Sequence, residues 1–231
     1  MPRATSRRSN IEGTGLAHTA DLSLRCRCGT VRGVARDAEP SKINHCFCYC
    51  DDCQAFVHFL GRADDILDAH GGTEITQMSQ ANVGFTAGTD KIAAMRLTPK
   101  GLLRWYASCC GTPIGNTLGT SAMPFIGVVH AFIDAPSTAL GPIRGRGWAD
   151  RAKGGRAAVP KDGSSDLVMV ARMLGKLLKW RLRGDHKRSA LFDAATGKPL
   201  VEPRVLDVAE REELRRRCAR WRAEAPAAGS A

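Results

Sequence analysis

The chain has 231 residues, of which 43% are hydrophobic, so it can bury a core and is not compositionally disordered. No stretch approaches the roughly 18 consecutive apolar residues of a membrane span, which argues against a transmembrane protein. The start of the chain lacks the apolar stretch of a secretory signal, so we expect a cytoplasmic location in which the cysteines stay reduced.

The net charge of +11 is distributed unevenly along the chain. Residues 1–140 carry a net charge of +1, whereas residues 141–231 carry +10. Every cysteine except Cys218 lies in the first, nearly neutral part. This division predicts a flexible N-terminus at 1–20, a zinc domain at 21–140, a linker or loop at 141–165 and a helical, basic C-terminal extension at 166–231.

Short strands separated by turn signals dominate the first part, which predicts a mainly β fold with short helices. Alternating residues at 22–28 and an extended segment at 43–48 indicate two strands. A helix is expected at 51–60 with Asp51 as its N-cap, and a helical turn at 62–72. Residues 73–78, 82–86, 93–98 and 102–107 are then expected to form a β-meander with hairpins at 87–90 and 99–101. Pro113 and Pro124 suggest that 112–118 and 124–133 are edge or terminal strands.

The C-terminal part is predicted to be helical. An amphipathic helix is expected at 166–184, with Asp166 as N-cap and Gly184 as its stop signal. A last helix is expected to begin at Asp207, where Asp207 and Glu210 have the spacing of a capping box. One side of the first helix carries four basic residues, which are Arg172, Lys176, Lys179 and Arg183.

Seven cysteines fall into three short clusters that are typical of metal ligands. The clusters are Cys26 and Cys28; Cys48, Cys50 and Cys53; and Cys109 and Cys110. In a reduced compartment such spacings favour thiolate ligands over disulfides, and close pairs within a cluster would be strained as disulfides. Tetrahedral zinc is the expected metal.

The number of ligands separates structural zinc from catalytic zinc. A structural site closes with four protein ligands, whereas a catalytic site keeps three and leaves one position for water or substrate. The middle cluster supplies three cysteines at the start of a helix, whose dipole favours thiolates. We therefore expect two zinc ions per chain, one in an open site at the middle cluster and one in a closed site made by the other two clusters.

Three motifs are similar to those of the glutathione-dependent formaldehyde-activating enzyme (GFA) family, which shares its domain with centromere protein V (CENP-V). They are CRCG at 26–29, CYCDDCQAF at 48–56 and CCGTPIG at 109–115. The resemblance covers residues 21–130, and the C-terminal extension looks like that of one bacterial branch of the family. It implies an Mss4-like zinc-binding β fold, a catalytic zinc at Cys48, Cys50 and Cys53, and a structural zinc at Cys26, Cys28 and Cys110.

One departure from the family pattern concerns the fourth ligand of the structural zinc. Ala107 stands where the family has a cysteine, and Cys109 is adjacent to Cys110 instead. Neighbouring residues of a strand point to opposite faces, so both can bind one ion only if the chain turns sharply at Gly111. The candidates for the fourth ligand are Cys109, Cys46 and His45, of which we favour Cys109.

The resemblance implies a carbon–sulfur lyase-type enzyme that promotes the addition of a small aldehyde, such as formaldehyde, to a thiol such as glutathione. Anionic glutathione requires a cation in its pocket. The sequence offers Arg62, Lys91, Arg96 and Arg104 for this role.

Several residues near the clusters have both a functional and an ordinary interpretation. His58 could carry protons, Asp51 and Asp52 could orient ligands, and one of Trp105 and Tyr106 could line a pocket. Packing, capping and turn roles explain these residues as well. The same holds for three polar residues after the third cluster, which are Thr112, Asn116 and Thr117.

A binding module is the alternative to an enzyme. In that case zinc only stabilises the β domain, and the basic C-terminal region contacts nucleic acid or a protein partner. The region contains no recognised nucleic-acid motif and few aromatic residues for stacking, which favours the enzyme. A smaller third alternative is a thiol redox sensor that uses Cys46.

Overall fold

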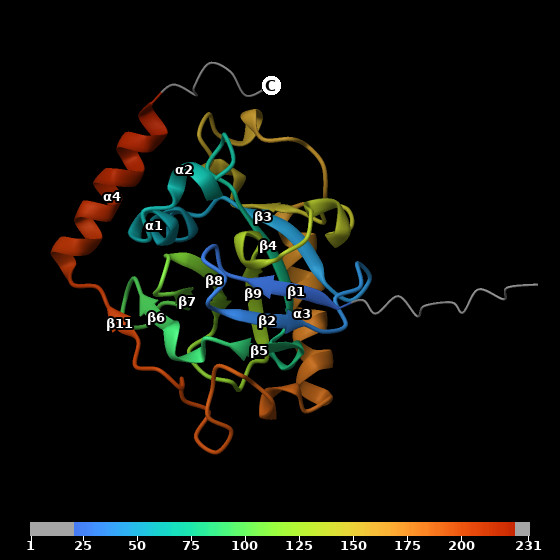
Figure 1. Ribbon diagram of the computed structural model, residues 1–231. Helices are drawn as coiled ribbons and strands as arrows, with labels where there is room; N and C mark the ends of the chain where they lie inside the picture. Colours follow the sequence, from blue (N-terminus) through green and yellow to red (C-terminus); the bar gives the residue numbers. More distant parts are fainter. Residues whose placement is uncertain (1–20, 225–231) are drawn as a thin grey trace, which may run out of the picture.

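The computed structural model describes residues 21–224 of the 231-residue chain. In this range it contains eleven strands in two sheets and four α-helices, so the fold mixes α and β structure (Figure 1). The predicted flexible segment 1–20 lies outside the described residues. The strands are β1 (Leu22–Arg25), β2 (Arg32–Ala35), β3 (Asn44–Cys48), β4 (Thr73–Ser79), β5 (Val83–Ala87), β6 (Ile92–Arg96), β7 (Leu103–Ala107), β8 (Thr112–Thr117), β9 (Phe125–Val129), β10 (Arg146–Gly147) and β11 (Arg204–Val205). The helices are α1 (Asp51–Phe59), α2 (Ala63–Ile66), α3 (Asp166–Leu182) and α4 (Val208–Ala223).

The larger sheet has the strand order β10-β3-β4-β9-β8-β7-β6-β11. Strands β6 to β9 form an antiparallel meander, and β4 continues the sheet through antiparallel pairing with β9 and β3. The two outer strands, β10 and β11, both come from the C-terminal region and pair in parallel with β3 and β6. The C-terminal region therefore covers both edges of the large sheet, where unpaired backbone groups would otherwise be exposed.

The smaller sheet has the strand order β1-β2-β5. The predicted meander is therefore wrong at β5, which belongs to this sheet and not to the larger one. β5 pairs with β2 and with neither of its sequence neighbours, so the predicted hairpin at 87–90 is wrong. Ser79 ends β4 by accepting a hydrogen bond from the backbone N–H of Ala81, and the following 3₁₀ turn leads the chain toward the second sheet. The predicted hairpin at 99–101 is confirmed, because it joins the paired strands β6 and β7.

The strands β8 and β9 lie inside the large sheet, so the prediction that they are edge or terminal strands is wrong. Pro113 is tolerated there because the register between β7 and β8 shifts at Trp105 and Tyr106, opposite the proline. Such an irregularity removes the need for the N–H group that proline lacks. Pro124 lies just before β9 and takes no place in its ladder.

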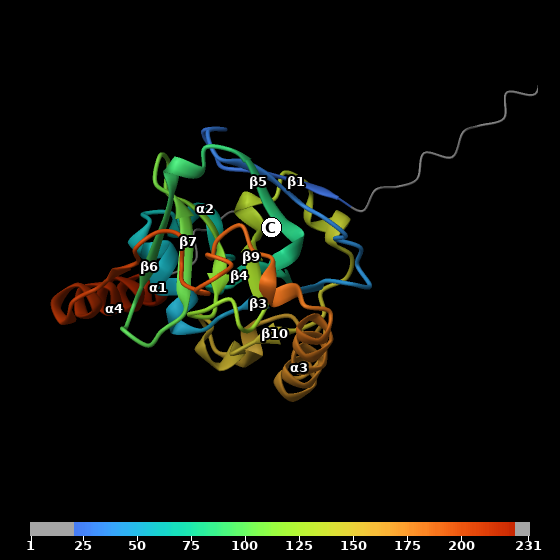
Figure 2. The same cartoon turned by 90° about the horizontal axis from the view of Figure 1, so that it is seen from below.

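The segment 141–165, which the sequence predicts to be a linker or loop, lies against the large sheet. It contributes β10, and its residues Ala149, Ala152 and Val159 are buried with Tyr49 of the β3–α1 connection. Short, Gly-rich segments give little hydrophobic periodicity, so this packing leaves no signal in the sequence. Figure 2 shows α3 on the outer side of β10, whereas α4 lies beside α1 at the opposite side of the molecule.

The helices predicted at 51–60 and 166–184 begin at the predicted residues, but two of the three predicted N-caps lie one residue earlier. The N-cap of α1 is Cys50, whose side chain accepts a hydrogen bond from the backbone N–H of Cys53, so the predicted Asp51 cap is wrong. The N-cap of α3 is Ser165, one residue before the predicted Asp166. The capping box at the start of α4 is confirmed, because Asp207 and Glu210 bond to each other's backbone N–H groups.

The main core fills the space between the two sheets. Its fully buried side chains include Leu24 and Val31 near the small sheet and Trp105, Ile114 and Ile126 of the large sheet. Within residues 21–224, no helix combines the length and the apolar character that crossing a membrane requires.

Candidate metal centres

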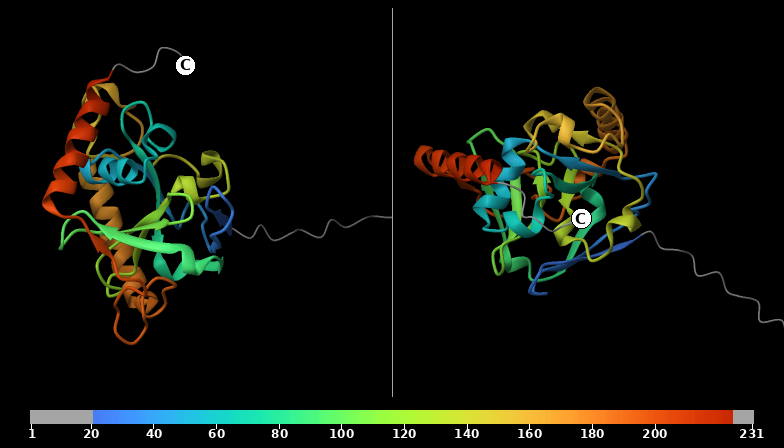
Figure 3. Two further views of the ribbon diagram at one scale, coloured as in Figure 1. Left: turned by 60° about the vertical axis from the view of Figure 1, so that its left-hand side comes forward. Right: turned by 90° about the horizontal axis from the view of Figure 1, so that it is seen from above.

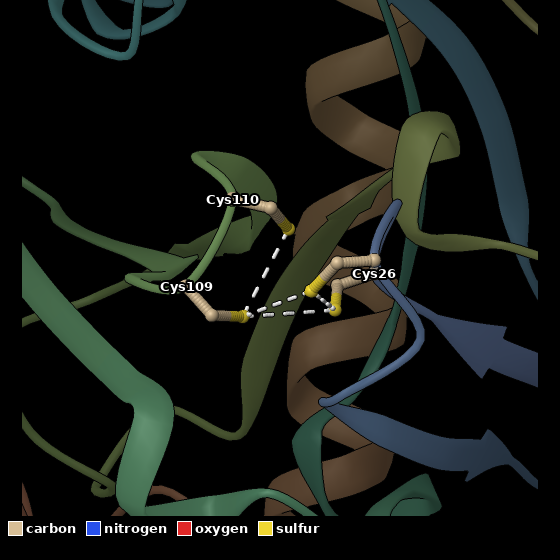
Figure 4. A group of neighbouring side chains, drawn as sticks. Cys26, Cys109 and Cys110 are labelled. Atoms are coloured by element: carbon tan, nitrogen blue, oxygen red, sulfur yellow. Dashed lines mark hydrogen bonds between the residues drawn. The ribbon is translucent and has the colours of Figure 1, made fainter.

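The first candidate site joins two loops that are far apart in the sequence. Cys26 and Cys28 follow β1, and Cys109 and Cys110 form the tip of the β7–β8 hairpin. The four sulfur atoms lie within 4.8 Å of one another. Figure 4 shows Cys26, Cys109 and Cys110 converging from the two loops. We call these four residues the four-cysteine cluster.

A sharp backbone turn allows two adjacent cysteines to face the same point. The N–H of Gly111 donates to the carbonyl of Ala107 at 2.9 Å, and Gly111 adopts a positive φ of 66°. A residue with a side chain would be strained in that conformation. Cys109 and Cys110 therefore lie in the turn and not in an extended strand, which removes the alternation that would separate them.

The sulfur separations of the four-cysteine cluster match tetrahedral zinc. Four ligands at 2.3 Å from one ion would lie about 3.8 Å apart. Cys26 Sγ is 3.9 Å from Cys109 Sγ and 3.5 Å from Cys28 Sγ, the Sγ atoms of Cys109 and Cys110 are 3.9 Å apart, and those of Cys28 and Cys109 lie closer, at 3.3 Å. The residues present fit a closed four-sulfur site.

Hydrogen bonds to Cys26 and Cys28 favour the thiolate form of these two cysteines. The backbone N–H of Val31 donates to Cys26 Sγ at 3.2 Å. Hydrogen bonds from the hydroxyl and the backbone N–H of Thr30 lower the pKa of Cys28 to about 6. Thr112, a predicted candidate for ligand binding, belongs to this cluster: its Oγ1 accepts from the N–H of Arg27 and lies 3.1 Å from Cys110 Sγ.

The second candidate site is formed where β3 meets α1. Cys48 ends β3, Cys50 is the N-cap of α1, and Cys53 lies in its first turn. Their sulfur atoms lie within 4.8 Å of one another, with 3.3 Å between Cys48 and Cys50. We call these residues the three-cysteine cluster. No His, Asp, Glu or further Cys among residues 21–224 offers a fourth ligand atom within that limit.

The two other candidates for a zinc ligand, His45 and Cys46, lie outside the four-cysteine cluster. His45 Nδ1 lies 2.9 Å from the carbonyl of Gly141, and Nε2 lies 2.7 Å from Oε1 of Glu74. Cys46 is 2% exposed, packs with Cys48 and Cys53 and contributes to the wall of the cavity beside them, and burial raises the pKa of its thiol to about 12. The structure thus places Cys109, and neither of these residues, with Cys26, Cys28 and Cys110.

A cavity of about 480 Å³ opens beside the three-cysteine cluster. Its wall is mainly apolar and includes Phe47, Ile75 and Phe125 from the large sheet. The C-terminal region completes the wall with Trp148, Arg151 and Met169, which the sequence analysis did not identify. Met169 reaches the cavity from the first turn of α3 and packs tightly on β10, since a Cβ on Gly147 would lie 2.6 Å from its methyl group.

Arg104 is the predicted cation that the structure places at the cavity. Its guanidinium is 1% exposed and donates to Oδ1 of Asn116 at 3.1 Å and to Oδ2 of Asp52 at 3.2 Å. Its Nη1 lies 4.0 Å from Cys53 Sγ. Hydrogen bonds from Cys48 and Cys50 and the charge of Arg104 hold the pKa of the Cys53 thiol well below its usual value.

The remaining predicted cations lie away from the cavity. Arg62 is paired with Asp65, Lys91 with Asp90, and Arg96 donates to the carbonyl of Gly101. Sequence spacing alone could not identify Arg104, because its position depends on the register of β7 beside β8 and on the placement of α1.

Most of the other residues that the sequence analysis considered for a functional role serve in packing or in hydrogen bonds within the fold. His58 is buried against Trp221 of α4, and burial lowers the pKa of its imidazole. The indole of Trp105 is fully buried and donates to Thr117, whereas Tyr106 packs against Phe59. Of the group after the third cysteine cluster, Asn116 lines the cavity.

Comparison with known proteins corrects the family that the cysteine motifs suggest. A family model described as "Family of unknown function (DUF6151)" matches residues 19–204, and no curated protein matches the chain. The predicted membership of the GFA/CENP-V family is therefore wrong, and the Mss4-like fold, which that resemblance alone implied, stays a prediction. The cysteine motifs suggested the wrong family because the same short cysteine spacings provide the ligand geometry of a metal in unrelated chains. Since the matched segment makes up more than half of the chain and runs from before β1 to β11, the protein belongs to this family of unknown function (DUF6151).

Proposed function

We propose that the protein binds two zinc ions and uses one of them to promote the addition of a small aldehyde to a thiol, the reverse of carbon–sulfur cleavage. The four-cysteine cluster would hold a structural ion, and the three-cysteine cluster would hold an ion with one position open. The observation that carries this proposal is the cavity beside the three sulfur atoms, because a purely structural site needs no cavity.

Zinc held by Cys48, Cys50 and Cys53 would supply a Lewis acid that lowers the pKa of a thiol entering the open position. The residues of the chain have three further tasks. Arg104 and Arg151 attract a thiol that carries carboxylates, and Asn116 holds the guanidinium of Arg104 in place. The apolar wall limits water around the reacting atoms. In the proposed reaction the sulfur forms a bond to the carbonyl carbon, and the proton of the thiol ends on the former carbonyl oxygen.

The size and lining of the cavity support a small organic ligand. Its volume of about 480 Å³ lies within the 300–1,000 Å³ that is usual for ligand sites, and apolar side chains dominate its wall. Its polar groups, which include Arg104, Asp52 and Asn116, gather beside the cysteines. Such a ligand would place its thiol at the metal and its anionic groups against the guanidinium.

The proposal is tested by measuring hemithioacetal formation from formaldehyde and glutathione with the full, zinc-loaded chain. We expect the wild-type protein to accelerate the reaction and Cys50→Ser to abolish the acceleration while one zinc ion stays bound. Cys218→Ser, a buried cysteine of α4 outside both clusters, is the matched control and should retain activity. If the wild-type protein gives no acceleration over buffer, the proposed activity is wrong for this pair of substrates.

The nucleic-acid alternative finds less support in the C-terminal region. Many arginines of α4 and its surroundings are paired with acidic residues of the chain. These pairs include Arg204–Glu210, Arg215–Glu212, Arg216–Glu213 and Arg222–Asp51. A filter-binding titration would test the alternative, since phosphate contacts produce an affinity that falls steeply with salt.

A further inference from the structure

The helix α3 presents an apolar face that nothing in the described part of the chain covers. Its inner side carries the buried residues Met169, Leu177 and Trp180. On the outer side four leucines are exposed, with 78% for Leu167 and 79% for Leu182. Leu174 and Leu178 lie between them and are 59% and 61% exposed. At 100° per residue the four leucines fall within about 80° around the helix axis, so they form one stripe.

A cationic sector borders this stripe along the helix. Arg172, Lys176, Lys179 and Arg183 follow the leucines around the axis and span about 60°. Among residues 21–224, no carboxylate lies within ion-pair distance of Arg172, Lys176 or Lys179. Arg172 donates to the carbonyl of Arg144 and to Oγ of Ser164, and Lys176 donates to the carbonyls of Ser41 and Lys42, whereas Lys179 is exposed. Burial and, to a lesser extent, the charges of Lys179, Arg144 and Arg172 lower the pKa of Lys176.

The helix α3 lies on the outside of the molecule and forms an exposed ridge. In the right-hand view of Figure 3 α3 lies at the periphery of the molecule, away from α4, and within residues 21–224 its outer leucines are exposed. Seventeen residues give a ridge about 25 Å long. A helix with an aliphatic face and a lysine- and arginine-rich flank is suited to lie in the interface of a membrane, where the apolar side chains enter the lipid and the cations meet anionic headgroups.

We propose that the outer face of α3 docks on an anionic phospholipid surface through Leu167, Leu174, Leu178 and Leu182, with the neighbouring cations on the headgroups. This inference does not depend on the proposed activity. The two sites are close in space, because Met169 on the inner side of the same helix lines the cavity of the three-cysteine cluster.

A second copy of the chain fits the same face less well. The only acidic residue of α3 is Asp166 in its first turn, which is paired with Arg156, so a partner α3 offers no charge complement to the cations. The ridge also presents roughly 250 Å² per partner, well below the approximately 800 Å² of a stable interface. An anionic bilayer has neither restriction.

The test is flotation of the full, zinc-loaded chain with vesicles of phosphatidylcholine alone or mixed with phosphatidylglycerol. We expect binding to the mixed vesicles, weak binding to neutral ones, and loss of binding in high salt. Leu174→Gln/Leu178→Gln should weaken binding at least tenfold, because both apolar side chains leave the lipid while glutamine keeps the helix. Lys179→Gln should weaken binding to the mixed vesicles about fivefold.

Matched controls are Leu200→Gln and Lys100→Gln, which change an exposed leucine and an exposed lysine elsewhere and should leave binding unchanged. Zinc content and circular dichroism verify that each variant is folded. Absence of vesicle binding by the wild-type chain would overturn the proposal. Concentration-dependent self-association that Leu174→Gln/Leu178→Gln abolishes, without vesicle binding, would assign the face to a second copy instead.

Discussion

The two cysteine clusters have similar ligands but different surroundings. The four-cysteine cluster lies at the tips of two loops, and Cys28 and Cys109 are exposed. The three-cysteine cluster lies between a strand and a helix, with Cys53 6% exposed, a buried guanidinium beside it and a cavity in front of it. A closed set of ligands in exposed loops serves to connect those loops, whereas an incomplete set at a cavity can take an external ligand.

The largest expected effect is loss of the connection made by the four-cysteine cluster. Cys110→Ser would remove a ligand of the proposed ion between the β1–β2 loop and the β7–β8 hairpin. Structural zinc contributes on the order of 10 kcal/mol in small metal-dependent domains, so losing even part of it should lower the melting temperature by roughly 10 °C or more. Thermal unfolding together with zinc analysis measures the effect. An unchanged melting temperature with one zinc lost would show that this cluster is not structural.

The matched change in the three-cysteine cluster should affect function more than stability. Cys50→Ser is expected to remove one zinc ion and the activity, yet to lower the melting temperature by only a few degrees. The reason is that β3 and α1 are also held by the sheet and by packing of α1 on α4. A fall as large as that of Cys110→Ser would remove the distinction between the two clusters.

An intermediate effect on function is expected from replacing Arg104, which lies beside the three-cysteine cluster and has no buried counterpart at the four-cysteine cluster within residues 21–224. Arg104→Met should raise KM about tenfold for a thiol with carboxylates and leave the KM for an uncharged thiol nearly unchanged. Its cost in stability should be about 1–3 kcal/mol, because the buried amide oxygen of Asn116 loses a donor, whereas Asp52 is 59% exposed and can be solvated. Arg96→Met on β6 is the control, and an equal rise for both thiols would contradict the assigned role.

The smallest effect is expected at Cys46, which tests whether three or four sulfurs act at the cavity. Cys46→Ala removes a buried thiol that lies outside the ligand set, so zinc content should stay at two per chain and stability should fall by about 1 kcal/mol. Loss of one zinc ion from this variant would show that Cys46 completes a closed site.

Features that depend on a few neighbouring residues could be predicted from the sequence. Features that depend on pairing between distant strands could not. The short cysteine spacings, the turn at Gly111 and the capping box at Asp207 are encoded within a few residues, and the structure joins the cysteines into two clusters and shows the turn and the capping box. The pairing of β5 with β2 and the interior positions of β8 and β9 depend on contacts between distant segments. A strand pattern does not contain that information.

The C-terminal region gives the clearest example of this limit. Its Gly-rich first segment predicted a linker, yet β10 pairs with β3 beside Cys48, and Trp148, Arg151 and Met169 line the cavity. A two-residue strand and a single methionine on an amphipathic helix carry no recognisable signal by themselves. The match of the family to residues 19–204 agrees with this arrangement, because it includes β10, α3 and the start of β11.

The most direct test of the open metal site is X-ray absorption at the zinc edge of the purified, zinc-loaded chain. We predict two zinc ions with about 3.5 sulfur ligands per ion on average, rising toward about four when a thiol is added. Two ions with four sulfur ligands each before any thiol is added, or a three-cysteine cluster that binds no metal, would contradict the account.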